Sequence, residues 1–229
     1  MNRLENNAFF DNVPDFLQLL FTKTDYPWQI IPLIKEYAIQ LIDDGIDGYS
    51  LIKDGVLVGR KVDIHESATI GAPAIIGEGA VIRPGAYIRG SVIISPRCVI
   101  GNSTEIKNSV LLTGAQAPHY NYVGDSVLGS HSHLGAGAIC SNLKADKSSV
   151  TVHADRGIDT GLRKLGAILG DGAEIGCGCV LNPGTVVGKH TTVYPLTSLR
   201  GVYPPNSIVK SANVIVEKKL ARCQSSISP

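Results

Sequence analysis

The sequence predicts a mainly β protein: a single-stranded parallel β-helix of hexapeptide repeats, preceded by a short N-terminal helical cap. Three observations lead to this prediction. Aliphatic residues recur every six positions from residue 58, and a small or β-branched residue stands four positions after each of them. Most of the aromatic residues lie before residue 50, in segments with helical spacing. A period of six fits neither an α-helix nor an ordinary hairpin, and hexapeptide repeats are typical of parallel β-helices.

These patterns divide the chain into three parts. We expect a helical cap over residues 1–50, a β-helix over 51–213 and a loosely held tail over 214–229. The β-helix should carry two insertions, at 113–121 and 143–168. We assign to the cap the task of covering one end of the coil, because an open end exposes unpaired strand groups and solenoids protect such ends.

The cap should contain two helical segments. Pro14 begins the first, which includes Phe16–Phe21, and Pro27 begins a longer one that runs toward Asp44 and stops at Gly45. One face of the second segment is apolar, and amphipathic helices usually bury such a face in the core. Its members are Trp28, Ile31, Ile34, Tyr37, Ala38 and Leu41.

The repeat itself runs through most of the chain. Its aliphatic positions number twenty: Val58, Ile64, Ile70, Ile76, Ile82, Ile88, Ile94, Ile100, Ile106, Leu112, Tyr122, Leu128, Leu134, Cys140, Leu169, Ile175, Leu181, Val187, Val193 and Leu199. Each hexad predicts a short strand and a corner, with the aliphatic side chain pointing inward. Cys98 and Cys179 occupy small positions of the repeat, which favours a structural role for these thiols.

Composition excludes several function classes. With 21 Lys and Arg against 20 Asp and Glu, the net charge of +1 argues against nucleic-acid binding and against a polybasic membrane anchor. No apolar run approaches a membrane span of about 20 residues, and the N-terminus lacks the apolar core of a signal peptide. We therefore expect a cytoplasmic protein with reduced cysteines. Their spacing suggests no zinc site, and we expect no metal.

The two interruptions of the repeat are candidates for function, because insertions on repeat scaffolds commonly form the binding face. Ten residues separate Leu112 from Tyr122, and 29 separate Cys140 from Leu169. His119 lies in the first interruption. An imidazole there can act as a general base near neutral pH, and the alternative is a plain surface histidine.

Three ordered motifs resemble a known family: Pro118–Asp125 (PHYNYVGD), Leu134–Ala138 (LGAGA) and then Asn142. They are similar to the acetyltransferase domain of bifunctional N-acetylglucosamine-1-phosphate uridyltransferases. Gly161–Ala167 (GLRKLGA) extends the resemblance to the archaeal-type sugar-1-phosphate nucleotidylyltransferases. The resemblance implies a left-handed β-helix with three hexads per coil, hence six to seven coils. It also implies a homotrimer.

The resemblance further implies an N-acetyltransferase that moves an acetyl group from acetyl-coenzyme A to the amine of a hexosamine 1-phosphate, with glucosamine 1-phosphate as the expected acceptor. Position by position, it assigns the catalytic base, the sugar-phosphate contacts and a backbone contact to acetyl-coenzyme A. These residues are His119 as the base, Arg83, Lys107, Tyr122 and Asn142 for the substrate, and Ala136 for the acyl carrier.

Several alternatives remain open. Arg83 and Lys107 suit a phosphate but also suit a solvated face, Tyr122 also suits a packing position, and Asn142 also suits a turn. Bulky Tyr194 stands where the family's carrier channel has small residues. A non-catalytic sugar-phosphate-binding or assembly module, serving a separate nucleotidyltransferase, is therefore the second hypothesis. No nucleotidyltransferase motif occurs, so we expect no such activity in this chain.

A γ-type carbonic anhydrase shares the expected prism and is a third hypothesis. It is disfavoured because His131 and His133 have the wrong spacing for that enzyme's zinc ligands. Both histidines fall in ordinary hexads, where the favoured interpretation is an outward-facing side chain.

Overall fold

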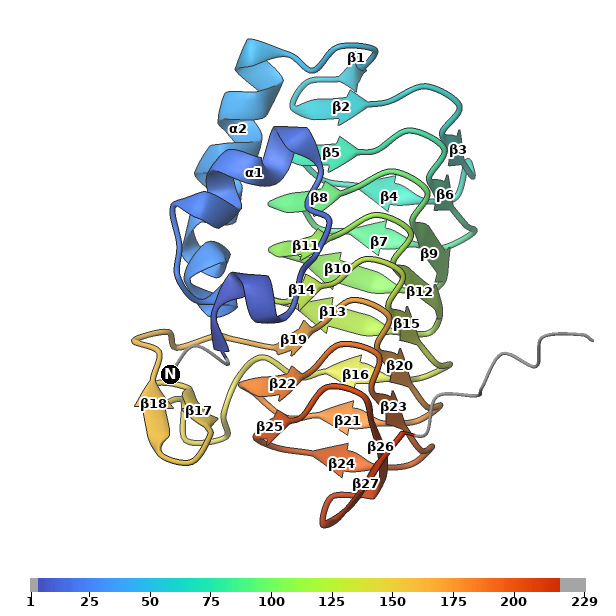
Figure 1. Ribbon diagram of the computed structural model, residues 1–229. Coiled ribbons are helices and arrows are strands. Elements are labelled where there is room, and N and C mark those ends of the chain that lie inside the picture. Colours follow the sequence, from blue (N-terminus) through green and yellow to red (C-terminus); the bar gives the residue numbers. More distant parts are fainter. Residues whose placement is uncertain (1–3, 219–229) are drawn as a thin grey trace, which may run out of the picture.

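The computed structural model describes residues 4–218, and these form a parallel β-solenoid with helices packed along one side (Figure 1). Three sheets, which we name A, B and C, make up its walls. Sheet A contains β1 (Ser50–Lys53), β2 (Val56–Val58), β5 (Ala74–Ile76), β8 (Val92–Ile94), β11 (Ser109–Leu111), β14 (Val127–Leu128), β19 (Ala167–Leu169), β22 (Thr185–Val187) and β25 (Val202–Tyr203).

The other two walls are built in the same way. Sheet B contains β3 (Asp63–Ile64), β6 (Val81–Ile82), β9 (Val99–Asn102), β12 (Gln116–His119), β15 (His133–Leu134), β20 (Glu174–Ile175), β23 (Thr192–Val193), β26 (Ser207–Ser211) and β27 (Val214–Glu217). Sheet C contains β4 (Thr69–Ile70), β7 (Tyr87–Ile88), β10 (Glu105–Lys107), β13 (Tyr122–Gly124), β16 (Ile139–Cys140), β21 (Val180–Leu181) and β24 (Ser198–Leu199).

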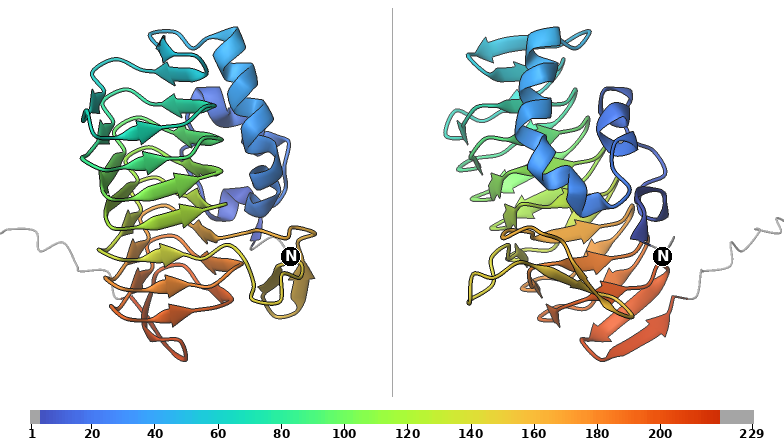
Figure 2. Two further views of the ribbon diagram at one scale, coloured as in Figure 1. Left: turned by 180° about the vertical axis from the view of Figure 1, so that it is seen from behind. Right: turned by 90° about the vertical axis from the view of Figure 1, so that its left-hand side faces the viewer.

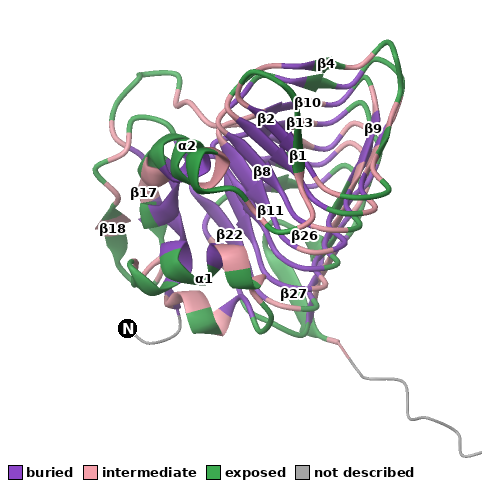
Figure 3. Ribbon diagram, turned by 90° about the horizontal axis from the view of Figure 1, so that it is seen from above, coloured by how far each residue is buried: buried purple, intermediate pink, exposed green. Residues whose placement is uncertain are grey.

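Each coil passes from sheet A to sheet B to sheet C. Within residues 4–218 the strands form seven complete coils, from β2-β3-β4 to β22-β23-β24, and β25 and β26 begin an eighth. Seen from the β1 end, the chain turns counterclockwise as it recedes, so the coil is left-handed (Figure 3). The predicted fold class is confirmed, although the solenoid is longer than the six to seven coils expected.

The predicted inward positions are correct for most of the repeat. Their side chains form one continuous buried core between the three sheets, from Val58 to Leu199, and Ile64 is the partly buried member near the first coil. Two positions are wrong. The inward residue of sheet A in the fourth coil is Leu111 rather than Leu112, and that of sheet C is Val123 rather than Tyr122.

The structure places no insertion at 113–121. Strand β12 (Gln116–His119) lies in ordinary parallel register, with Ala117 opposite Ile100 and His119 opposite Asn102. The repeat instead loses one residue at each of two corners between sheets C and A. The inward residues step by five positions from Ile106 to Leu111 and again from Val123 to Leu128.

These two short corners have a local cause. Each contains a single residue in the left-handed region of backbone conformation, Asn108 with φ 45° and Asp125 with φ 49°. Asn and Asp adopt that conformation more readily than other non-glycine residues, so they turn the chain in fewer steps. The two shortened corners shift the phase of the repeat between Ile106 and Leu128. In the sequence this shift resembles an inserted segment.

The N-terminal helices cover a face of the solenoid rather than its end (Figure 2). They comprise a 3-10 turn η2 (Asn6–Ala8), α1 (Asp15–Thr22), a 3-10 helix η3 (Pro27–Leu33) and α2 (Ile34–Asp44). The predicted second helix is thus divided, with Pro32 inside its 3-10 part. Its apolar face is buried as expected and packs in one cluster with the outward residues Leu57, Ile75, Ile93, Val127 and Ile168 of sheet A.

Antiparallel strands, rather than the helices, stand at the two ends of the solenoid. Strand β1 pairs antiparallel with β2 at one end, and β27 pairs antiparallel with β26 at the other. The expectation of a loosely held tail from residue 214 is wrong for Val214–Glu217, which is this paired strand. The expected tail beyond residue 218 lies outside the described residues.

One long connection leaves the coil between β16 and β19. It contains an antiparallel hairpin of β17 (Thr151–His153) and β18 (Gly157–Asp159), which projects beside the helices (Figure 1). Leu165 and Val150 in this connection are fully buried against the outer face of sheet A. Among residues 4–218, no helix is long and apolar enough to cross a membrane.

Candidate functional site

His119 stands at the corner where the fourth coil passes from sheet B to sheet C. Its carbonyl oxygen accepts a hydrogen bond of 3.0 Å from the Gly137 amide, which belongs to the corner of the next coil. Ala136, in that same corner, accepts a bond of 2.8 Å from the Gly178 amide one coil further on. The predicted base and the predicted carrier contact therefore lie on adjacent rungs of one backbone ladder.

The corner that carries His119 is held rigidly. The amide oxygen of buried Asn121 accepts a bond of 3.1 Å from the His119 backbone amide, and its Nδ2 donates to the Gly135 and Ala138 carbonyls at 2.8 and 3.2 Å. Tyr120 between them takes the left-handed conformation, with φ 51°. The imidazole itself is exposed and makes no hydrogen bond within residues 4–218, so it is free to face a ligand.

A second group of side chains gathers on the outer face of sheet C. It lies around the ends of β10, β13 and β16 that point away from the His119 corner. The Lys107 Nζ lies 3.2 Å from Oδ2 of Asp125, a carboxylate only 3% exposed. Asn142 donates from Nδ2 both to that carboxylate and, at 3.2 Å, to the Tyr122 hydroxyl. Asn108 donates to the other Asp125 oxygen at 2.8 Å. The structure thus joins Lys107, Tyr122 and Asn142 through Asp125.

Gly124 makes this meeting possible. A Cβ at position 124 would lie 2.6 Å from both Asn142 Nδ2 and the Tyr122 hydroxyl, so any side chain there would displace them. Burial raises the pKa of Tyr122, and the charges of Asp125 and Glu105 add to that shift. The phenol therefore stays protonated. Since Asn142 donates to its oxygen, its own O–H remains available to an oxygen of a ligand.

The structure separates Arg83 from this group. Arg83 follows β6 at the corner between sheets B and C, two coils before His119, whereas Lys107 ends a strand of sheet C. The register of β10 with β7 instead places Arg89 directly beside Lys107. Arg89 is exposed and forms an ion pair of 2.9 Å with Glu105. The cation next to Lys107 is therefore Arg89.

Sequence reasoning missed four contributors: Arg89, Asp125 as the linking carboxylate, Asn121 and Gly124. The signal for Arg89 was present, because 18 residues separate it from Lys107 and three hexads make one coil. Residues one coil apart share a face, so spacing by 18 identifies neighbours. The hydrogen bonds of Asp125 depend on the short corners, which the hexad count did not reveal.

Chemically, the two groups are complementary. The corner offers an imidazole that can accept a proton, and the outer face offers two adjacent cations with a phenol and an amide beside them. Arginine and lysine in such proximity favour a phosphate. Within residues 4–218, no three His, Cys, Asp or Glu side chains are arranged to hold a metal ion.

The class of protein follows from this fold and its repeat: the chain is a hexapeptide-repeat parallel β-helix. The family described as "GMPPB C-terminal domain" matches residues 70–162. The "Bifunctional sugar-1-phosphate nucleotidylyltransferase/acetyltransferase" of Sulfurisphaera tokodaii is 37% identical over 176 residues, which cover 74% of this chain and 43% of the relative. The "Bifunctional protein GlmU" of Methanocaldococcus jannaschii is 34% identical over 200 residues, 85% of this chain and 48% of the relative.

Among solved structures, a hexapeptide transferase family protein from Anaplasma phagocytophilum aligns over 73% of this chain and 82% of its own, with 16% identity and a TM-score of 0.41. The chain spans about half the length of the curated relatives it matches. It is an acetyltransferase-like β-helix domain, akin to the acetyltransferase part of the GlmU proteins and of the archaeal bifunctional sugar-1-phosphate proteins.

Proposed function

We propose that this protein transfers an acetyl group from acetyl-coenzyme A to the amine of a hexosamine 1-phosphate, with glucosamine 1-phosphate as the acceptor. The observation that carries the proposal is the placement of His119 and Lys107 on neighbouring coils: His119 ends β12 at the corner that leads into β13, and Lys107 ends β10, which pairs with β13 in sheet C. The amine and the phosphate of this acceptor stand on adjacent ring carbons, so the base and the phosphate cation must act on neighbouring substituents of one sugar.

In this mechanism the acceptor lies over Tyr122, with its phosphate toward Arg89 and Lys107. Both cations have carboxylate partners in the free protein, Glu105 for Arg89 and Asp125 for Lys107, and the phosphate competes with these partners. The Tyr122 O–H and the Asn142 amide, held by Asp125, then orient the sugar. Arg83 lies on the same row of corners as His119 but two coils before it, so it takes no part in this mechanism.

The chemical step belongs to the His119 corner. The amine binds as an ammonium and must lose a proton before its lone pair attacks the thioester carbonyl, and the imidazole takes that proton. The C–N bond forms as the thiolate of coenzyme A leaves. The Gly137 and Gly178 amides of the corner ladder already donate to carbonyls, so the proposal assigns stabilisation of the oxyanion to the Ala136 amide. The carrier arm runs along the same ladder toward the later coils, and no metal takes part in this proposal.

A second candidate is a non-catalytic sugar-phosphate-binding module that assists a separate nucleotidyltransferase. One observation favours it. Further along the ladder of His119 and Ala136, the corner of the seventh coil carries Tyr194 and Leu196, which are 45% and 84% exposed. The Leu196 amide donates to the Cys177 carbonyl, so these bulky side chains stand directly on the path proposed for the carrier arm.

One assay separates the two candidates. The purified chain is incubated with acetyl-coenzyme A and a set of amino-sugar phosphates, and thiol release is followed with a chromogenic reagent. The enzyme hypothesis predicts turnover with glucosamine 1-phosphate and little with unphosphorylated glucosamine. Equal turnover of both sugars would contradict the phosphate requirement. Binding of glucosamine 1-phosphate without any thiol release would favour the second candidate.

A further inference from the structure

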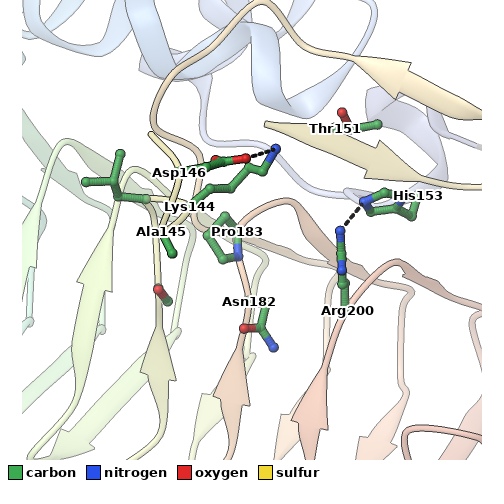
Figure 4. A pocket seen from close by; sticks show the side chains of 10 residues that line it. Lys144, Ala145, Asp146, Thr151, His153, Asn182, Pro183 and Arg200 are labelled. Atoms are coloured by element: carbon green, nitrogen blue, oxygen red, sulfur yellow. Dashed lines mark hydrogen bonds and ion pairs between the residues drawn. The ribbon is translucent and has the colours of Figure 1, made fainter. Parts of the chain in front are cut away.

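A separate cavity lies on the C-terminal half of the solenoid, where the long connection 143–166 folds back over the edge of sheet C (Figure 4). Its volume is about 490 Å³. The floor comes from residues that follow the strands of sheet C, namely Ser141, Asn182 and Arg200, and the wall comes from Leu143–Asp146 and from β17. This wall belongs to the second interruption of the repeat, which the sequence indicated as a candidate for function.

The charged groups of the cavity are divided between two sides. On one side the Lys144 ammonium lies 3.8 Å from the Asp146 carboxylate, so the two charges compensate each other. On the other side Arg200 Nη2 lies 3.0 Å from His153 Nε2. Figure 4 shows these two pairs on opposite sides of the cavity, with Asn182 and Pro183 between them.

The Arg200 pair is unusual because it lacks an acid. Within residues 4–218 the guanidinium of Arg200 has a histidine as its side-chain partner and forms no ion pair with a carboxylate. An arginine fork next to an imidazole presents several N–H donors in one direction, and a planar fork suits the oxygens of a phosphate. Thr151 adds a short polar side chain at the same end, whereas Asn182 Nδ2 already donates to Ser198 Oγ and to the Leu199 carbonyl.

This cavity is distinct from the cluster around Lys107. Arg200 follows β24, and Lys107 ends β10, which is four strands away in the order of sheet C. At about 4.8 Å between neighbouring strands, the two positions are roughly 19 Å apart along the solenoid. One phosphate cannot reach both. A volume of 490 Å³ also suits a phosphate together with the group that carries it.

We propose that this cavity is a second anion site, which binds a phosphate-bearing group through Arg200, with His153 and Thr151 as supporting partners. Two sources of such a group are compatible with the proposed reaction. One is the nucleotide end of the acyl carrier, and the other is a nucleoside diphosphate attached to a larger acceptor sugar. Both present the same chemistry to Arg200, and the test distinguishes them.

The test measures binding rather than turnover. Isothermal titration of the full chain uses inorganic phosphate, adenosine 3′,5′-bisphosphate and uridine diphosphate as probes at constant ionic strength. All variants also carry Lys107→Ala, which weakens phosphate binding at the first cluster. Arg200→Ala should weaken binding of the probe at least tenfold. Arg200→Lys keeps the charge but loses the planar guanidinium, so its affinity should lie between those of the parent and of Arg200→Ala. Arg97→Ala removes an exposed arginine on another corner and serves as the matched control.

The outcomes are distinct. A loss with Arg200→Ala, absent with Arg97→Ala, supports the site, and circular dichroism of both variants excludes unfolding. Tighter binding of the adenosine bisphosphate then assigns the site to the carrier, and tighter binding of uridine diphosphate assigns it to the acceptor. Equal binding by Arg200→Ala and its parent, or no binding of any probe at millimolar concentration, would overturn the proposal. A failed acetyltransferase assay would leave this result unaffected.

Discussion

At the scale of single residues, the site depends on side chains that hold other side chains. Asp125 is buried, yet it accepts hydrogen bonds from Lys107, Asn108 and Asn142, so its charge is distributed over three donors. Asn121 fixes the backbone of the His119 corner in the same manner. Neither residue needs to touch a substrate. Both decide where the residues that do so are placed.

The first prediction concerns His119. His119→Ala should lower kcat about 10²–10⁴-fold, which is the usual contribution of a general base and corresponds to about 3–5 kcal/mol of barrier. The fold should be unaffected, because this exposed side chain contributes nothing to the core. Steady-state kinetics at saturating substrate measure the effect. His131→Ala and His133→Ala are the matched controls and should be mild, and near-full turnover of His119→Ala would refute the assignment.

The second prediction separates the two arginines. Arg89→Ala and Lys107→Ala should raise KM for the acceptor at least tenfold with a smaller change in kcat, because both remove ground-state contacts to the phosphate. Arg83→Ala should leave the KM of both substrates nearly unchanged, because Arg83 lies two coils before His119. If Arg83→Ala raised the acceptor KM and Arg89→Ala did not, the register argument for Arg89 would fail.

Much of the site was visible in the sequence at this scale, but its connections were not. The resemblance supplied Lys107, Tyr122 and Asn142, and the structure brings these three together. The resemblance also assigned the phosphate contact to Arg83, which is 24 residues before Lys107. One coil has 18 residues, so the neighbour of Lys107 is Arg89 instead. Burial and hydrogen bonding of Asp125 arise from the positive φ of one corner residue, and no local sequence signal marks that conformation uniquely.

At the scale of elements, the N-terminal helices serve as an apolar cover for sheet A. The outward side chains of β2, β5, β8, β14 and β19 are aliphatic, so this face resembles a core rather than a surface. The 3-10 helix η3 contributes Trp28, Ile30 and Ile31, all buried. Helices and sheet therefore form one second core, parallel to the core inside the solenoid.

The third prediction tests this second core. Ile30→Ala removes a fully buried side chain and should lower the free energy of unfolding by about 2–5 kcal/mol. Leu19→Ala, on the exposed face of α1, is the matched control and should change it by less than about 0.5 kcal/mol. Urea denaturation followed by tryptophan fluorescence measures both. Equal destabilisation would mean that the cover adds nothing specific at Ile30.

The position of this cover could not be predicted from its own sequence. Helical periodicity identified the apolar face of 27–44 correctly, but that face fits any apolar partner. The partner was also encoded, in aliphatic residues between the hexad positions, such as Ile75 and Ile93. A strand with aliphatic side chains on both faces is buried on both faces. The six-residue period of the inward positions was recognised, but the same period in the outward aliphatic residues of sheet A was not.

At the scale of the whole molecule, the solenoid presents two open walls and one covered wall. The helices cover the outer face of sheet A, whereas within residues 4–218 the outer faces of sheets B and C carry no helices (Figure 3). Sheet C carries exposed Tyr87 and Val180 together with the Lys107 cluster. If copies of the chain associate side by side, they must use these two walls.

The fourth prediction is the homotrimer that the resemblance implies, packed through sheets B and C because sheet A is covered. Light scattering at micromolar concentration should give about three times 24.2 kDa. Val180→Asp, on the outer face of sheet C, should shift the protein toward the monomer, and Ile39→Asp, exposed on α2, should not. A monomer of the unmodified chain under these conditions would refute the prediction.

The fifth prediction concerns alkaline pH. Complete burial raises the pKa of the Cys98 and Cys140 thiols to about 12. A raised folded-state pKa stabilises the fold fully below the ordinary thiol value near 8.5, and that contribution disappears as pH rises toward 12. The urea concentration at the unfolding midpoint should accordingly decrease as the pH is raised from 8 to 10.5. The double variant Cys98→Ala and Cys140→Ala, less stable at pH 8, should show a shallower fall, whereas an equal slope would contradict thiol ionisation as the cause.

The reversal of strand direction at both ends has a consequence for how the number of coils can change during evolution. A parallel coil can in principle continue by adding another turn at its end, but β1 runs against its neighbour at one end of sheet A and β27 does so at the other end of the solenoid, in sheet B. Each of them therefore blocks one of the three sheet edges at its end. A new turn is therefore easier to add internally, as a block of 18 residues, with the terminal hairpins carried along unchanged. Lineages related to this chain should differ by whole internal turns while their ends stay constant, and fibres made by end-to-end stacking should be rare.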